Sequence, residues 1–132
     1  MSNEIKVGLT GEYSKVVEKD DLASSMGSGG TDVFATPKLL LLMEVTCFNM
    51  VEDLLEDGVS TVGISADFSH LAATPLGMKV TAKAKLIEID RKKLTFDVEV
   101  YDEKELIGKG THGRFIIDRD KFTQKAYGKK NV

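Results

Sequence analysis

The sequence has 132 residues, of which 42% are hydrophobic and 30% charged, and it carries a net charge of −3. This length predicts one domain, expected to cover residues 1–132, and is enough to bury a core without disulfide bonds. Acidic and basic residues are interspersed along the chain, without the basic stripe that binds a phosphate backbone, so we expect no nucleic-acid partner. The one cysteine, Cys47, excludes an intrachain disulfide and fits a reducing compartment.

Targeting signals are not evident in the sequence. The first 17 residues lack the apolar segment of a secretory signal peptide. The apolar run over residues 39–51 is too short to span a membrane and is interrupted by Glu44 and Asn49. We therefore expect a cytoplasmic protein with no membrane partner.

The N-terminal third begins with residues 5–17, IKVGLTGEYSKVV, which predict a first strand or two short extended segments. Residues 18–32, EKDDLASSMGSGGTD, are acidic and then rich in small residues and glycine. This composition predicts a loop or a mobile lid.

A long helix is predicted next. Thr36 and Pro37 form a start signal, because a threonine hydroxyl can cap a helix and proline suits its first position. The helix is expected to run from Pro37 to about Glu56 and to end before Gly58. Its first half, KLLLLMEVTCF, is apolar on nearly all sides, which is typical of a helix surrounded by protein.

After Gly58 the pattern changes to alternation, which predicts strands. The short segments RKK and EKE between them predict hairpins and hence an antiparallel sheet. A further strand, LIGKGTHGRFIID, and a short helix, RDKFTQKAY, end the chain. The apolar residues predicted to share a face within each strand are Val62, Ile64, Ala66 and Phe68, then Val80, Ala82, Ala84 and Leu86, then Leu94, Phe96, Val98 and Val100.

One long buried helix followed by about four long strands predicts an α+β fold. Burying a helix on all sides requires a sheet that wraps it, and a long central helix wrapped by a curled antiparallel sheet is the hotdog fold. A single sheet of this kind exposes its edges and leaves part of the helix uncovered. We therefore expect two copies to pair as a homodimer.

Glu44 is the sharpest signal of a site. A carboxylate within an apolar helix needs a partner or a function, because burial raises its pKa and an adjacent cation lowers it. It is either a catalytic group or half of a salt bridge at a dimer interface, and the sequence favours neither. Cys47, one helical turn away, is interpreted as a buried, inert thiol.

Histidines and glycines give weaker signals. His70 ends a predicted strand beside the turn AATPLG, where a site residue fits, although an ordinary surface histidine is the commoner case. Gly108, Gly110 and Gly113 match G-x-G-x-x-G, but a strand follows them where the dinucleotide motif needs a helix. They are interpreted as strand glycines at a close backbone approach. We predict no metal site, because the histidines and acidic residues lack suitable spacing.

Three separated segments together resemble the fluoroacetyl-CoA thioesterase family, a branch of the hotdog thioesterases. They are VFATPKLLLLMEVTC, VGISADFSHLAATPLGMKVT and GKGTHGRFIID, and the resemblance covers about residues 30–122. It implies that Thr36, Glu44 and His70 form a catalytic set. It also implies hydrolysis of an acyl-CoA thioester by a homodimer that uses neither a metal nor an organic cofactor.

The same resemblance places Gly63 and Arg114 near the active site and makes Phe34 a substrate-binding residue. The family enzyme carries aromatic residues in a lid ahead of the helix, whereas this chain has DLASSMGSGGTDVF, with Phe34 alone near its end. Pro37 also replaces a smaller residue after the threonine. A lid of small residues predicts a hydrolase of small or medium acyl-CoA without selectivity for a fluorinated acyl group.

Several chemical roles stay open. Glu44 is expected either to activate water or to attack the thioester carbonyl, with Thr36 positioning it and His70 orienting the network or protonating the leaving thiolate. Backbone N–H groups at the helix start or near Gly63 are candidates to stabilise the oxyanion. One alternative is an acyl-CoA-binding hotdog protein without catalysis, and another is a hydratase that leaves the thioester intact.

Overall fold

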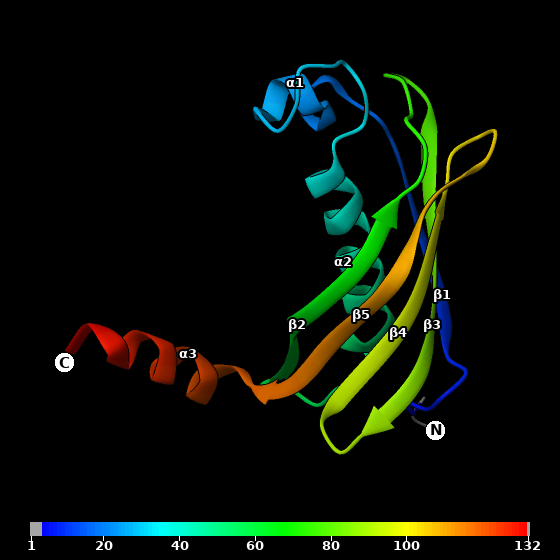
Figure 1. The fold of residues 1–132 in the computed structure, drawn as a ribbon. Coiled ribbons are helices and arrows are strands. Elements are labelled where there is room, and N and C mark those ends of the chain that lie inside the picture. The colour runs from blue at the N-terminus through cyan, green and yellow to red at the C-terminus, as the bar shows by residue number, and fades with distance from the viewer. Residues whose placement is uncertain (1–3, 132) are drawn as a thin grey trace.

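The computed structural model of the protein describes residues 4–131. A long helix follows a short N-terminal strand, and four long strands follow the helix (Figure 1). The elements are β1 (Thr10–Val16), η1 (Lys19–Asp21), α1 (Ala23–Met26), α2 (Thr36–Glu52), β2 (Val59–His70), β3 (Lys79–Asp90), β4 (Lys93–Tyr101), β5 (Leu106–Asp118), α3 (Arg119–Tyr127) and η2 (Gly128–Asn131).

The five strands form one antiparallel sheet in the order β1-β3-β4-β5-β2. Helix α2 lies against one face of this twisted sheet (Figure 1). The α+β arrangement and the four long strands are as predicted, and the C-terminal helix has the predicted bounds. Strand β1 is shorter than predicted and starts at Thr10.

Helix α2 differs from the prediction at both ends. Ala35 is its N-cap and Thr36 is already helical, with no side-chain capping bond, so the prediction of Thr36 as the cap was wrong. The helix ends at Glu52, and the next amides, those of Leu54 and Leu55, bond three residues back. Four acidic side chains over residues 52–57 explain the early end, because negative charge opposes the dipole at a helix C-terminus.

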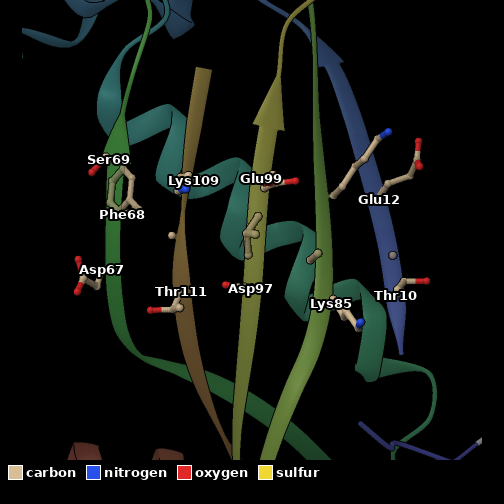
Figure 2. Close-up of a pocket in the computed structure, with 15 residues that line it drawn as sticks. Thr10, Glu12, Asp67, Phe68, Ser69, Lys85, Asp97, Glu99, Lys109 and Thr111 are labelled. Atoms are coloured by element: carbon tan, nitrogen blue, oxygen red, sulfur yellow. The ribbon is translucent and has the colours of Figure 1, made fainter. Parts of the chain in front are cut away.

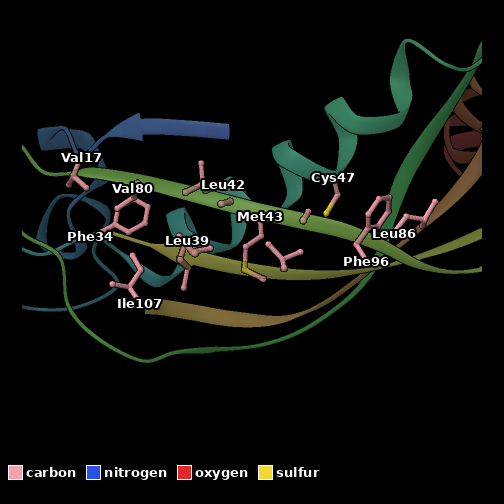
Figure 3. Close-up of a cluster of buried hydrophobic side chains, with 14 of the residues drawn as sticks. Val17, Phe34, Leu39, Leu42, Met43, Cys47, Val80, Leu86, Phe96 and Ile107 are labelled. Atoms are coloured by element: carbon pink, nitrogen blue, oxygen red, sulfur yellow. The ribbon is translucent and has the colours of Figure 1, made fainter. Parts of the chain in front are cut away.

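The core lies between α2 and the inner faces of β3 and β4. Figure 3 shows Leu39 and Met43 of α2 among side chains such as Val80 and Phe96 from the sheet. Every apolar residue predicted to face inward on β3 and β4 is buried, which confirms these two faces. Burying such side chains stabilises a fold by about 1.5–3 kcal/mol each.

Strand β2 carries a bulge that breaks its predicted face. Val62 pairs with Phe115, whereas Ala66 pairs with His112, and the register shifts between Gly63 and Ser65. Because Phe115 and His112 are an odd number of residues apart on a regular stretch of β5, their partners face opposite sides of the sheet. The prediction that Val62 shares a face with Ala66 was therefore wrong.

The glycines of β5 lie in a strand, as interpreted from the sequence. A side chain at Gly110 would collide with the backbone of Asp67 and Phe68 on the neighbouring strand. The glycine therefore permits close packing against β2 and forms no dinucleotide loop.

Helix α2 and the edge strand β2 each have an exposed apolar side chain. Leu41 of α2 is 46% exposed and Ile64 of the edge strand β2 is 49% exposed. Helix α3 leaves the end of β5 and projects away from the sheet (Figure 1). Among residues 4–131, no helix is long and apolar enough to cross a membrane.

Asp21 anchors the segment that precedes α2. Its side chain is 3% exposed and pairs with Lys15 Nζ at 2.6 Å and Lys38 Nζ at 3.5 Å. It also accepts the backbone N–H of Glu18 at 2.9 Å. Burial alone would raise the pKa of Asp21, but Lys15, the Glu18 amide and Lys38 together hold it below its usual value.

We expect Asp21→Asn to lower the free energy of unfolding by about 1–3 kcal/mol at neutral pH, because two lysines lose a buried partner. Since the folded pKa is depressed, the wild-type contribution is present above the unfolded pKa and is lost as pH falls through the folded pKa. Urea unfolding of both proteins from pH 7 to pH 3 should show the difference shrink. Asp20→Asn, at the exposed neighbour, is the control.

Candidate functional site

Thr36 and His70 meet at one end of the molecule. Thr36 opens α2, His70 ends β2, and Thr36 Oγ1 lies 2.8 Å from His70 Nδ1. The second ring nitrogen, Nε2, is buried and has no hydrogen-bond partner among the described residues. Burial lowers the pKa of His70, against a smaller opposing effect of the Ala72 backbone, and so favours the neutral ring. The threonine hydroxyl therefore forms a hydrogen bond with His70 and does not cap the helix.

A cavity of about 480 Å³ opens beside this pair. Thr36 and His70 line one part of it, and Phe34, which is itself buried, lines another. The segment predicted as a loop or lid supplies small residues to the wall and contains η1 and α1. Isolated bridges from Leu22 to Phe34 and from Val33 to Pro75 tie it down. Its mobility stays a prediction.

Glu44, Gly63 and Arg114 form a second group near the middle of α2. Glu44 Oε2 lies 3.8 Å from Arg114 Nη1, and the Glu44 side chain is 42% exposed. A Cβ added at Gly63 would lie 2.6 Å from the same carboxylate oxygen. The absence of a side chain at Gly63 therefore leaves space for the carboxylate against β2.

The structure does not bring all three predicted catalytic residues together within one chain. Thr36 and Glu44 are eight residues apart on α2, which corresponds to about 12 Å along the helix axis. Glu44 does not line the cavity beside Thr36 and His70. One chain thus holds a Thr36–His70 group and a Glu44–Arg114 group at separate places.

Two residues around Arg114 were missed by the sequence reasoning. Arg114 Nε donates to Thr61 Oγ1 at 2.8 Å, and Nη1 lies 3.1 Å from His112 Nε2. Burial, aided by the Arg114 charge, lowers the pKa of His112 against opposing effects of the Ser65 carbonyl and Glu44. Alternation along β5 was an available signal, because it places both His112 and Arg114 on the inner face, opposite Phe96 and Leu94.

Comparison with known proteins identifies the family of this chain. Residues 17–120 match the family described as fluoroacetyl-CoA-specific thioesterase. The chain belongs to this family. It is 37% identical over 94 residues to the fluoroacetyl-CoA thioesterase of Streptantibioticus cattleyicolor. The matched segment covers 71% of this chain and 68% of that protein.

Solved structures confirm the hotdog fold of this family member. A variant of the fluoroacetyl-CoA thioesterase FlK, solved in complex with acetyl-CoA, has a TM-score of 0.90 and 30% identity and covers 95% of this chain and 98% of its own. A thioesterase superfamily member from Thermus thermophilus has a TM-score of 0.89 at 24% identity, covering 97% of this chain and 95% of its own, and supports the fold alone.

Cys47 is no candidate nucleophile in this family member. Its side chain is fully buried, and burial raises the pKa of the thiol to about 12, with Glu44 adding to the effect and Arg114 opposing it. The thiolate needed for attack is therefore scarce at neutral pH. The interpretation of Cys47 as a buried thiol is confirmed, and its inertness stays a prediction that the raised pKa supports.

A hollow larger than this cavity lies on the face of the sheet away from α2 (Figure 2). It measures about 980 Å³, and none of the candidate residues lines it. Cross-strand partners in it alternate in charge, with Glu12 opposite Lys83 and Glu99 opposite Lys109. Such a pattern is typical of a solvated sheet face. Within residues 4–131, no group of three or more metal-ligating side chains is placed to hold a metal ion.

Proposed function

We propose that this protein is an acyl-CoA thioesterase that hydrolyses small or medium acyl-CoA to the free acid and CoA. Membership of a thioesterase family and the acetyl-CoA complex of a similar enzyme support the reaction and the CoA carrier. The observation that carries the proposal is the Glu44 carboxylate, which is half-exposed and lies beside a buried arginine. A carboxylate in this position is accessible to water and to substrate.

In this proposal Glu44 either removes a proton from water or attacks the thioester carbonyl. The Arg114 cation lies beside Glu44 without a hydrogen bond that would occupy the carboxylate oxygens, since the contact is 3.8 Å long. Thr36 orients His70 through the 2.8 Å hydrogen bond, and His70 either orients the network or protonates the leaving thiolate. Gly63 and Arg114 line the reacting carboxylate, and Phe34 bounds the acyl pocket.

The separation of the two groups supports a site shared by two copies. Strand β2 has one unpaired edge, and pairing it with the β2 strand of a second copy about a two-fold axis gives an antiparallel contact. Within one chain, Gly63 and His70 are seven residues apart, or about 23 Å along the strand. If the axis passed through the middle of β2, His70 of the second copy would lie opposite Val59, about 13 Å along the strand from Gly63. A homodimer of this geometry would therefore bring the two groups closer.

Thiol release from a panel of acyl-CoA esters tests the proposal. The panel contains acetyl-, fluoroacetyl-, medium-chain and aryl-CoA, and the expected result is turnover of short or medium chains without preference for the fluorinated ester. Small residues in the segment ahead of Phe34 are the reason, because they form no aromatic barrier over the pocket. A strong preference for fluoroacetyl-CoA over acetyl-CoA would contradict the substrate range.

The second candidate function is acyl-CoA binding without hydrolysis. It is favoured by the separation of Glu44 from Thr36 and His70 within one chain. Saturable binding of acyl-CoA, together with no thiol release from any ester of the panel, would replace the thioesterase proposal with this one.

Gly63 provides a further test of the Glu44 site. We expect Gly63→Ala to lower kcat at least about tenfold, because its methyl group would displace the Glu44 carboxylate from its position. The backbone φ of Gly63 is not in the left-handed region, so alanine itself is tolerated there. Steady-state kinetics and thermal unfolding, measured together, should show lost turnover in a folded protein. Wild-type kcat in the variant would argue against the site.

A further inference from the structure

Arg114 is an unusual buried cation. Its side chain is 5% exposed, and burial lowers its pKa. Its one salt bridge within residues 4–131 is the 3.8 Å contact with Glu44, which is longer than a hydrogen bond. A buried arginine that served stability alone would be expected to make a close bidentate pair, because an imperfect pair does not offset the loss of hydration. Something other than Glu44 therefore fixes this guanidinium.

Three hydrogen bonds hold it. Nε donates to Thr61 Oγ1 at 2.8 Å and Nη2 donates to the Thr61 carbonyl at 3.0 Å. The third joins Nη1 to His112 Nε2 at 3.1 Å. Nη1 is also the nitrogen that lies nearest the Glu44 carboxylate, so His112 contacts the same guanidinium nitrogen as Glu44 does.

These contacts fix the protonation state of His112. A guanidinium only donates hydrogen bonds, so His112 Nε2 must accept and carries no proton. The proton is then on Nδ1, which donates to the Ser65 carbonyl at 2.8 Å. The ring is therefore neutral and held in a single tautomer from both sides.

We propose that His112 is a positioning residue for the thioesterase reaction, which accepts a hydrogen bond from Arg114 and so directs the guanidinium at Glu44. The inference rests on the proposed function of Glu44. Thr61 fixes two nitrogens of Arg114 from β2, and His112 fixes the third from β5. The cation stays near the carboxylate without binding its oxygens, which remain free for water or the thioester.

The charged groups near His112 are Arg114 and Glu44, and the buried thiol of Cys47 lies close to the same pair. Protonation of His112 at Nε2 would remove the acceptor for the Arg114 hydrogen bond. It would also place a positively charged imidazole next to the Arg114 guanidinium, and the two charges would repel each other. Because burial already lowers the pKa of His112, the neutral form prevails at neutral pH and the arrangement is intact there.

Two variants distinguish the role of His112 Nε2 as a hydrogen-bond acceptor from the other contacts of the ring. His112→Asn can keep the bond to Ser65 but is too short to reach Arg114, whereas His112→Gln places a carbonyl oxygen near the position of Nε2. We expect the asparagine variant to lower kcat at least about tenfold with little change in KM, and the glutamine variant to recover kcat to within about threefold of wild type. Equal losses in both variants, or none in either, would overturn the proposal.

A double-mutant cycle shows whether His112 acts through Arg114. Once Arg114→Met is present, adding His112→Asn should change kcat less than about twofold. Thr74→Val, which removes another buried hydrogen bond, that to Asp102, controls for lost stability and should keep wild-type kcat. An undiminished effect of His112→Asn in the Arg114→Met background would show that the histidine acts independently.

Nitrogen NMR of His112 gives a readout that does not depend on turnover. The expected signature is a protonated Nδ1 and an unprotonated Nε2 at neutral pH, and the opposite tautomer or a doubly protonated ring would overturn the proposal. Wild-type protein that releases no thiol overturns the proposed function and the catalytic role of His112 with it. Wild-type turnover that His112→Asn leaves unchanged overturns the role of His112 alone.

Discussion

Glu44→Gln is expected to lower kcat for thioester hydrolysis by at least about a hundredfold, because an amide neither takes a proton from water nor attacks a carbonyl. The substitution keeps the size of the side chain beside Gly63, and the residue is half-exposed, so we expect the fold to survive. Thiol release from the best acyl-CoA ester and thermal unfolding of the same preparation provide the two measurements.

Glu52→Gln is the matched control on the same helix. Glu52 accepts a hydrogen bond from Ser60 and pairs with Arg119, and its charge affects Arg114 less than that of Glu44 does, so turnover should stay near that of wild type. Full activity of Glu44→Gln would remove Glu44 from the mechanism. A mass increase equal to the acyl group, seen in protein quenched during turnover, would favour direct attack by the carboxylate over activation of water.

Mixing two inactive variants is expected to restore activity if the site is shared between copies. Thr36→Ala damages one group and Glu44→Gln the other, so each homodimer has two damaged sites. In a mixed dimer with a shared site, one site collects both substitutions and the other has none. Random exchange makes about half of the dimers mixed, so recovery of about a quarter of wild-type activity is expected.

The control for this experiment is each variant subjected alone to the same exchange procedure, which should stay inactive. Subunit exchange itself is verified with two affinity tags. Exchange without recovered activity would show that each site is built within one chain, and a monomer in solution would remove the shared site altogether.

Much of the fold follows from local pattern. Alternation through Val80 to Leu86 and Leu94 to Val100 predicted buried faces correctly, because apolar side chains at a spacing of two can only meet a core on one side. Pro37 marked the start of α2 to within one residue, since its ring is compatible only with the first turn. The same local chemistry misled for Thr36, whose hydroxyl lies against a histidine 34 residues later in the chain.

What the sequence did not reveal depends on contacts between distant residues. Glu44 was singled out as an isolated charge, but its partner Arg114 and the space at Gly63 come from strands far along the chain. His112 was read only as part of a glycine-rich strand. Its role near Arg114 depends on Thr61 and Ser65, which pattern analysis has no means of placing beside it.

The bulge in β2 has a consequence for how the site is assembled. Gly63 and His70 differ by an odd number, so in a regular strand their side chains would point to opposite faces of the sheet. Residue pairing shows both on the inner side, because Ile64 is the extra residue between them. The one extra residue thus lets Gly63 and His70, which lie at different places along β2, both face the side of the sheet on which α2 packs. Deletion of Ile64 would change no catalytic residue, yet it would turn either Gly63 or His70 to the opposite, solvent-facing side of the sheet.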